Sequence, residues 1–274
     1  MEKYPKAIAD EFNGIEGERS YKNLVFTFNL NSVDKFNEAA QILLKYDYIY
    51  RGQRCYCDKW KLQSSFDRKY PNIGNRRKDK LYEIFEKFVQ KLGEIRNFND
   101  IDFKEDTIWA IGQHYGLPTP LLDWTKSPYI AAFFAFYKTS DDFQTENRVI
   151  YGLSRGLKLL LNYEKQRYIE FDNELEIVKE NLQSTQNKRL ENQQGELTKA
   201  LQGLDIKSIV DRFSRKVEGK EYTKGEIFLA ELLIPDKMRE EVLSFLRKRE
   251  ISHGTLFPDY AGAVEITKQE LMLV

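Results

Sequence analysis

The sequence predicts an α+β domain in which several helices pack on a mixed or mostly antiparallel sheet. Strand and helix patterns interleave along the 274 residues without a regular strand–helix–strand rhythm. Residues 127–138 are apolar on nearly every side, and such a helix belongs in the centre of a domain. With 41% apolar and 14% aromatic residues, the chain has enough apolar material for a single core.

Four elements are predicted in the first third of the chain. Periodicity and turn residues predict a strand, a helix, a short strand and a further extended segment at residues 23–29, 32–46, 48–51 and 61–65. Ser32 is suited to cap the helix. Residues 1–20 are polar and are expected to be loosely attached to a domain that spans residues 21–274.

The rest of the chain continues this mixture. Apolar spacing predicts helices at residues 78–95, 105–115, 127–138 and 236–250, and strands at residues 148–153 and 225–234. Gly116 is suited to end the second of these helices in a left-handed conformation, and Ser127 and Pro128 to start the third. Residues 163–200 are polar with a sparse apolar stripe, which predicts an exposed helical excursion with loop.

The overall charge argues against a global attraction to nucleic acid or anionic membranes, because 43 basic residues balance 43 acidic ones. Residues 76–80 are the best candidate for a local basic patch, with a solvated helix start as the alternative. No apolar run approaches the ~18 residues of a membrane span. The N-terminus lacks signal-peptide features and the two cysteines are too close for an ordinary stapling disulfide, so a cytoplasmic protein is expected.

Neither a metal site nor a familiar nucleotide motif is expected. Cys55, Cys57, His114 and His253 are the only cysteines and histidines, and they come from three separate segments without the usual zinc spacing. The chain also has no Gly-rich phosphate loop and no dinucleotide fingerprint, which argues against a Rossmann or Walker nucleotide site.

The most informative stretch is residues 113–125, just before the apolar helix. It reads as a short irregular loop that combines polar, aromatic, Gly and Pro residues, and binding and chemistry concentrate in such loops. The candidate site residues that it supplies are Gln113, His114, Tyr115, Thr119, Asp123 and Trp124.

This stretch resembles the signature of the FRG domain family, Gln-His-Tyr-Gly-x-Pro-Thr-x-Leu-Leu-Asp-Trp-Thr-x-Ser-Pro. The family's Phe-Arg-Gly motif stands here as Tyr50-Arg51-Gly52-Gln53. Two further matches follow in order, at Arg189 with Gln193-x-Gly195 and at residues 255–259 with Gly262. The sequence departs from the family pattern at Pro120, where Arg is usual, and at Leu197, where an aromatic residue is usual.

Arg51 at the end of a hydrophobic strand is a candidate phosphate ligand, because its guanidinium can bind two oxygens at once. Gly52 beside it would let a ligand approach the backbone. The alternative is a structural Arg paired with a buried carboxylate such as Asp123. We expect Arg51, Gln53, Gln113, Thr119 and Asp123 to converge on one cleft.

A second resemblance is to ADP-ribosyltransferases of the Arg-Ser-Glu type, and it implies NAD as substrate. The Arg and Ser correspond to Arg51 and to Ser64 or Ser65. A carboxylate is needed to stabilise the oxocarbenium-like state. Glu196 is the first choice for it, with Glu226, Glu231 and Glu265 as alternatives, and Tyr115 or Trp124 could stack the nicotinamide.

Two candidate residues have a structural interpretation beside the functional one. His114 could act as a general base or hydrogen-bond a loop carbonyl or Asp123. Asp123 could serve the site, cap the apolar helix or pair with Arg51. Gln193 is a candidate only through the family pattern.

Two functional hypotheses follow. The first is an NAD-consuming ADP-ribosyltransferase or NAD glycohydrolase, such as a toxin or phage-defence effector, with a protein or nucleic-acid target. The second is a non-catalytic module that binds a nucleotide or a partner protein in the same cleft. A carboxylate within reach of Arg51 and the serines discriminates between them.

Overall fold

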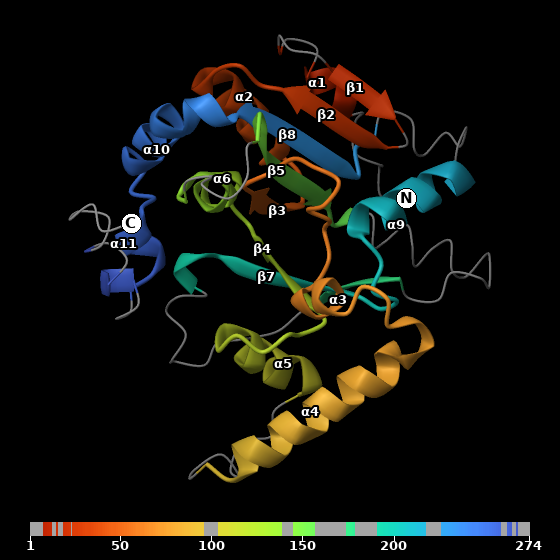
Figure 1. Cartoon of the computed structure of the whole chain (residues 1–274). Coiled ribbons are helices and arrows are strands. Elements are labelled where there is room, and N and C mark those ends of the chain that lie inside the picture. The colour runs from red at the N-terminus through yellow and green to blue at the C-terminus, as the bar shows by residue number, and fades with distance from the viewer. Residues whose placement is uncertain are drawn as a thin grey trace.

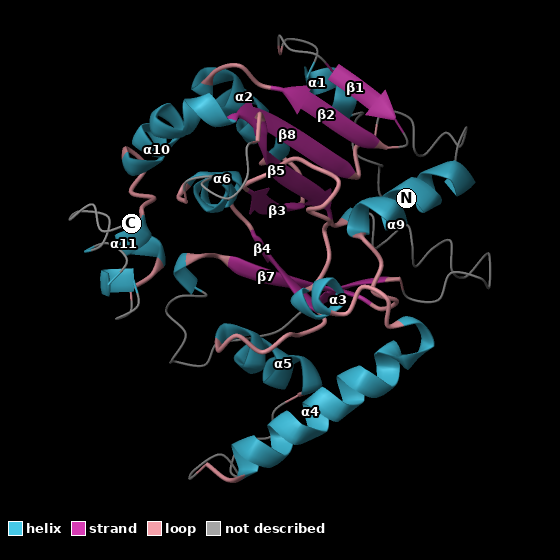
Figure 2. Cartoon of the chain, in the orientation of Figure 1, coloured by secondary structure: helices cyan, strands magenta, loops and turns pink. Residues whose placement is uncertain are grey.

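In the computed structural model, the chain folds around one eight-stranded sheet (Figures 1 and 2). The structure describes residues 8–12, 15, 19–22, 24–95, 104–138, 145–156, 174–178, 191–217, 226–258, 262–264 and 267. The strand order is β1-β2-β8-β5-β3-β4-β7-β6. Only β2 and β8 run parallel among these neighbouring strands, so the predicted mixed and mostly antiparallel sheet is confirmed.

The two strands at the centre of the sheet's larger half, β5 and β8, are buried along almost their whole length. Helices therefore cover both faces there. The strands are β1 (Arg19–Lys22), β2 (Val25–Asn29), β3 (Tyr48–Gln53), β4 (Leu121–Thr125), β5 (Asn147–Ser154), β6 (Leu175–Val178), β7 (Gly195–Ala200) and β8 (Leu229–Pro235).

The helices begin and end largely where their capping residues predict. Ser32 accepts a hydrogen bond from the Lys35 N–H at the start of α2, and Gly116 has a φ of +88° just after α5. The helical segments are α1 (Ile8–Glu11), α2 (Val33–Leu43), α3 (Ser65–Lys69), η2 (Gly74–Arg76), α4 (Arg77–Gly93), α5 (Glu105–His114), α6 (Pro128–Phe136), α9 (Ile206–Val217), η4 (Asp236–Met238), α10 (Arg239–Arg247) and α11 (His253–Leu256).

Helix α6 lies between the sheet and α10, and seven of its nine residues are buried. It packs so closely on β3 that a Cβ on Gly52 would lie 1.9 Å from the Ala131 carbonyl oxygen. The glycine of the Tyr-Arg-Gly motif therefore admits the backbone of α6. That a ligand also approaches the Gly52 backbone stays a prediction, and Gly52 is among the residues that line the pocket described below.

Two arginines hold the C-terminal end of α6. Arg148 is fully buried and donates to the carbonyls of Ala135 and Lys138, while its Nε pairs with Asp236. Arg239 donates to the carbonyls that lie between these two, at Phe136 and Tyr137. The carbonyls left open at a helix end are thereby satisfied, and the end of α6 is fixed in place.

The smaller half of the sheet, β4-β7-β6, packs against α5 and α4 (Figure 1). Trp109 of α5 contacts Leu121, Val178 and Leu197, one residue from each of the three strands. On the opposite face of the sheet, α9 covers β5 and β8 with Ile209, Val210 and Phe213 among others.

Three predictions about local structure are wrong. Residues 61–65 are not an extended segment, because Ser64 caps helix α3. Residues 121–125 are strand β4 rather than loop. Within residues 163–200, Leu175–Val178 and Gly195–Ala200 form β6 and β7, whereas residues 157–173 and 179–190 lie outside the described part. These strands are short, and their pairing with each other and with Trp109 decides their conformation against local composition.

The N-terminal segment that was expected to be loosely attached contains α1, and Ile8 and Phe12 are buried in the main core. None of the helices that the structure describes is both long enough and apolar enough to cross a membrane.

Candidate functional site

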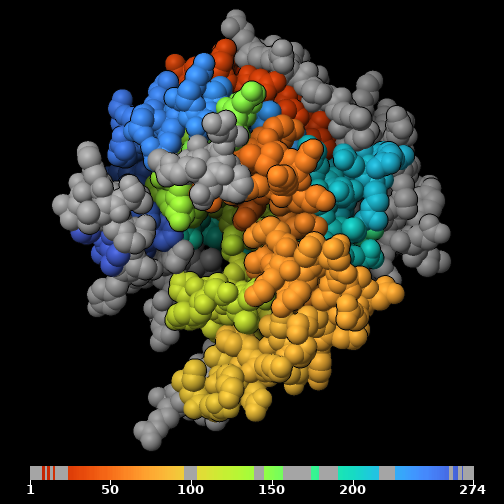
Figure 3. Space-filling view, viewed as in Figure 1, coloured from red at the N-terminus to blue at the C-terminus, as the bar shows by residue number. Residues whose placement is uncertain are grey.

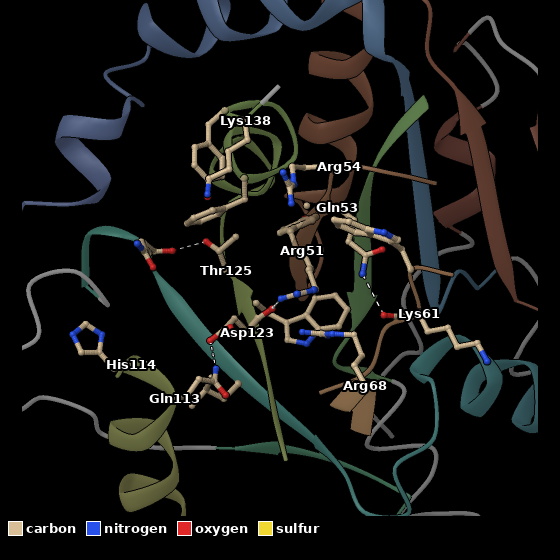
Figure 4. A pocket seen from close by; sticks show the side chains of 18 of the residues that line it. Arg51, Gln53, Arg54, Lys61, Arg68, Gln113, His114, Asp123, Thr125 and Lys138 are labelled. Atoms are coloured by element: carbon tan, nitrogen blue, oxygen red, sulfur yellow. Dashed lines mark hydrogen bonds between the residues drawn. The ribbon is translucent and has the colours of Figure 1, made fainter. Parts of the chain in front are cut away.

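A cavity of about 550 Å³ opens where β3 and β4 meet the C-terminal end of α6. Its walls come from β3 and the segment that follows it, the end of α5, β4, β7 and the end of α6 (Figure 4). The space-filling view shows the surface hollowed between the orange segment after β3 and the yellow-green α5 (Figure 3). We call this cavity the basic pocket, because Arg51, Arg54, Lys59, Lys61, Arg68 and Lys138 line it.

Arg51 occupies the centre of the basic pocket (Figure 4). Its Nη1 donates to the backbone carbonyl of Asp123 at 2.6 Å, which ties β3 to β4. Its Nε is buried and has no hydrogen-bond partner among the described residues. Burial lowers the pKa of the Arg51 guanidinium, and the neighbouring Asp123 carboxylate opposes that shift. Arg51 therefore has a structural contact and keeps donor capacity for an anion.

Asp123 extends from β4 into the basic pocket with its carboxylate exposed. One of its oxygens accepts a hydrogen bond from the Gln113 amide nitrogen. The Gln113 amide oxygen in turn accepts from the Thr119 hydroxyl. Because Thr119 donates to the oxygen, the NH₂ group of Gln113 is the end that faces Asp123.

Thr119 is fully buried and is itself held by α3. Its N–H donates to the Ser65 hydroxyl at 3.0 Å, and its carbonyl accepts from the Phe66 N–H at 3.1 Å. A continuous set of hydrogen bonds therefore runs from Ser65 through Thr119 and Gln113 to Asp123. Of the five residues expected to converge, Arg51, Gln53, Gln113 and Asp123 line the pocket, and Thr119 lies directly behind Gln113.

Three other predicted residues also line the basic pocket. His114 stands at the end of α5, and Trp124 is buried with its indole N–H on the Thr198 hydroxyl at 2.8 Å. Gln193 donates to the Leu256 carbonyl at 3.1 Å. Tyr115, by contrast, is 82% exposed and is not among the lining residues, so the structure does not present it as a stacking surface there.

The predicted serines and Glu196 stand outside the pocket lining. Ser64 caps α3 and donates to the Asp67 carboxylate at 2.6 Å, while Ser65 serves Thr119. Glu196 is followed in β7 by Leu197, which lines the pocket, and alternation along a strand sends Glu196 to the other face. Its carboxylate pairs there with Lys126 at 3.1 Å and Arg155 at 3.0 Å.

The alternative carboxylates are also not in the pocket lining. Glu226 is buried near Tyr46 and Tyr48, and Glu231 is buried in a separate network. Glu265 lies outside the described residues. Asp123 is therefore the one carboxylate among the residues found to line the basic pocket.

Sequence reasoning missed Arg54, Lys59, Lys61, Arg68 and Lys138. Within the described residues none of them forms an ion pair, and neither does Arg51. The predicted basic patch at residues 76–80 behaves differently, since Arg77 pairs with Asp67 and Lys80 with Glu83. The pocket cations are scattered along 85 positions, and only the fold gathers them. The dense basic run 59–61, with Trp60 between two lysines, was the available signal.

Among the residues that the structure describes, no group of three or more His, Cys, Asp and Glu side chains is arranged to hold a metal ion. Cys55 is buried and Cys57 exposed, and both are free thiols.

The fold and the basic pocket define an α+β domain with a cavity lined by cations beside β3 and β4. The family model described as FRG domain matches residues 46–144, and the chain therefore contains an FRG domain. The matched segment runs from β3 to just beyond α6 and supplies all but two of the pocket-lining residues, Gln193 and Leu197. Neither the curated proteins nor the solved structures that were searched gave a match.

Proposed function

We propose that the basic pocket binds a phosphate-bearing nucleotide, and that NAD is this nucleotide. The observation that carries the proposal is the set of six cations that have no ion pair within the described residues and that lie around a single exposed carboxylate. A cluster of like charges repels itself, and a bound anion removes that repulsion. A diphosphate suits Arg51 in particular, because a planar guanidinium can bind two phosphate oxygens at once.

The aromatic lining supports a nucleotide over a bare phosphate ion. Trp60, Phe134 and Tyr137 are partly exposed aromatic residues of the pocket wall, and the buried Tyr50 and Trp124 lie behind it. Aromatic rings are surfaces on which adenine and nicotinamide stack. A volume of about 550 Å³ is within the ~300–1,000 Å³ range of small-molecule sites.

NAD consumption is the second proposed step, and Asp123 takes the role first given to Glu196. In hydrolysis the bond between the ribose C1′ and the nicotinamide nitrogen breaks, and its electron pair leaves with nicotinamide. The oxygen of water then bonds to C1′ and the water gives up one proton. A carboxylate stabilises the oxocarbenium-like charge that develops in between. Gln113 holds one Asp123 oxygen, which orients the carboxylate for this task.

An NAD-consuming domain would serve as a toxin or as an antiphage effector, because loss of NAD arrests metabolism. Expression of the wild-type chain should then slow cell growth, and Asp123→Asn should relieve that effect. Unequal expression is controlled by immunoblotting both proteins. Equal growth at equal expression would remove this biological role and leave nucleotide binding untouched.

The direct test is calorimetric titration of NAD into the wild type, Arg51→Ala and Arg51→Lys. We expect binding by the wild type, none by Arg51→Ala, and little by Arg51→Lys, since a point charge does not replace the guanidinium fork. Arg247→Ala is the matched control, because Arg247 is an exposed arginine of α10 away from the pocket. Equal heats from all four proteins, or none from the wild type, would overturn the proposal.

Release of nicotinamide separates enzyme from binder. Asp123→Asn should bind NAD nearly as tightly as the wild type but release nicotinamide roughly 10²-fold more slowly. If the wild type binds NAD and releases no nicotinamide, the domain is the non-catalytic nucleotide-binding module.

A further inference from the structure

The basic pocket carries more positive charge than NAD can neutralise. Six cations and one carboxylate line it, whereas NAD brings one diphosphate and a positively charged nicotinamide ring. The chain as a whole has no net charge, so this surplus is local. A ligand with further phosphates would balance it.

The surplus is concentrated on the segment that follows β3. Arg54, Lys59 and Lys61 lie within eight positions of one another and all line the pocket together with Trp60. The Arg54 guanidinium stands over the Trp60 ring, 5.4 Å from its centroid. Both lysines are exposed, and the indole is half-buried. An aromatic ring flanked by cations is the arrangement with which proteins hold unpaired bases and the phosphates beside them.

This segment is fixed before any ligand arrives. The Gln53 side chain reaches the Lys61 carbonyl, and the next N–H, of Leu62, donates to the Asp205 carboxylate at 2.7 Å. The backbone N–H of Trp60 donates to the Cys57 carbonyl at 3.0 Å and so forms a turn. Because its backbone is held at several points, the Arg54–Lys61 segment loses little freedom when it binds.

We propose that single-stranded nucleic acid binds the basic pocket along the Arg54–Lys61 segment. In Figure 4, Arg54 and Lys61 lie on the side of Gln53 and Arg68 lies below Arg51, whereas Asp123, Gln113 and His114 lie on the opposite side. Phosphates contact Lys59 and Lys61, and a base stacks on the Trp60 indole or on the guanidinium above it. A cavity of about 550 Å³ is too small to take a duplex.

This inference deepens the proposed function, because it names single-stranded nucleic acid as the class of molecule that would accept ADP-ribose from NAD. Only this transfer step rests on the proposed function. If NAD is consumed by transfer, a hydroxyl or ring nitrogen of the strand bonds to C1′, gives up its proton, and nicotinamide leaves. Binding of the strand itself requires no NAD.

Fluorescence anisotropy with a labelled single strand of twenty thymidines tests the proposal. We expect binding that weakens as salt rises, with competition by unlabelled single strand but not by a duplex of equal length. The double variant Lys59→Ala/Lys61→Ala should flatten the slope of log affinity against log salt by about 1.4, at ~0.7 for each lost phosphate contact on a single strand. Trp60→Ala should weaken binding about tenfold or more, and Trp60→Phe should retain most of it.

The matched control is Lys87→Ala/Lys91→Ala, which removes two lysines that are 72% and 69% exposed on α4. Equal affinity of the two double variants would overturn the proposal. So would tighter binding of a poly-glutamate peptide of the same charge, which would identify an acidic protein segment instead.

The two proposals fail separately. A wild type that binds the oligonucleotide but not NAD would overturn the proposed function alone. One that binds NAD but no oligonucleotide would overturn this inference alone.

Discussion

Two groups of charged side chains in this domain are built in opposite ways. Glu231 in β8 is completely buried, and both of its oxygens are occupied. Thr27 and Tyr56 each donate to one oxygen at 2.9 Å, and Lys207 donates to the other at 2.6 Å. We call these four residues the Glu231 network. In the basic pocket, six cations have no ion pair in the described part of the chain.

This difference in pairing separates charged groups that stabilise the fold from charged groups that are available to a ligand. A buried carboxylate must have partners, and the Glu231 network provides them within the protein. The pocket cations have no ion-pair partner in the described part of the chain, and this is why we propose an external anion for them. The two groups are also connected, because Tyr56 belongs to the segment that carries Arg54, Lys59 and Lys61. The hydrogen bond from Tyr56 to Glu231 thereby anchors the segment that carries three of the pocket cations.

Both groups depend on one rigid sheet, and Gly52→Ala should disturb it most. The new Cβ would stand 1.9 Å from the Ala131 carbonyl oxygen, and backbone cannot move aside as a flexible side chain can. We expect a loss of several kcal/mol, larger than the ~1–3 kcal/mol of ordinary overpacking. Urea unfolding monitored by circular dichroism measures it.

Gly152→Ala on the neighbouring strand β5 is the control, since its Cβ would meet the nearest atom at an ordinary 3.4 Å. If the two variants unfold at the same urea concentration, β3 and α6 are not in the close contact on which the pocket wall depends.

Removal of the Glu231 carboxylate should be the next largest effect. Glu231→Ala leaves Lys207, Thr27 and Tyr56 without their acceptor and should cost roughly 3–5 kcal/mol. Loss of pocket cations should instead affect ligand binding and leave stability almost unchanged. Lys59→Ala and Lys61→Ala should change the free energy of unfolding by less than about 0.5 kcal/mol while weakening ligand binding. If Glu231→Ala and the two lysine variants lower the free energy of unfolding equally, the distinction between the Glu231 network and the basic pocket is wrong.

Thr119→Val tests the support of the pocket's carboxylate. The substitution removes the hydroxyl that donates to Gln113, whose amide oxygen is then left without that donor. We expect a loss of about 1–3 kcal/mol in stability and slower nicotinamide release, because the amide can turn its oxygen toward Asp123. Thr119→Ser keeps the hydroxyl and should restore nicotinamide release. A serine variant as slow as the valine variant would show that packing, not the hydroxyl, matters.

Much of the fold could be predicted from the sequence, because long elements carry strong periodic signals. The capped helices α2 and α6, the amphipathic helix α4 and the apolar strands β5 and β8 lie close to their predicted positions. The short strands β4, β6 and β7 could not be predicted. Their conformation depends on partners distant in the sequence, such as Trp109 packing on Leu197.

The candidate site divides in the same way. Arg51, Gln113 and Asp123 stood out because they sit in compact motifs, and the structure brings them together. The register of β7 could not be read, so Glu196 was assigned to the site although its carboxylate lies on the other face with Lys126 and Arg155. A cluster of cations that only the fold assembles was equally beyond sequence reasoning.

The smallest expected effect concerns a third carboxylate, that of Glu226. Glu226 is buried, and burial raises the pKa of its carboxyl from 4.5 to about 7. A raised pKa means that the folded state holds the proton more tightly than the unfolded state does. The resulting stabilisation is complete below about pH 4.5 and is lost as the pH rises through about 7. The wild type should therefore lose stability over this interval relative to Glu226→Gln, which cannot titrate.

Urea unfolding of the two proteins at pH 5, 6, 7 and 8 measures this difference directly. Glu231→Gln supplies the contrast, since its charge has Lys207 as a close partner and its removal should lower stability across the interval. A wild type whose stability runs parallel to that of Glu226→Gln at all four pH values would show that Glu226 is ionised in the folded protein. Burial of the Glu226 side chain would then not be enough to keep its carboxyl protonated.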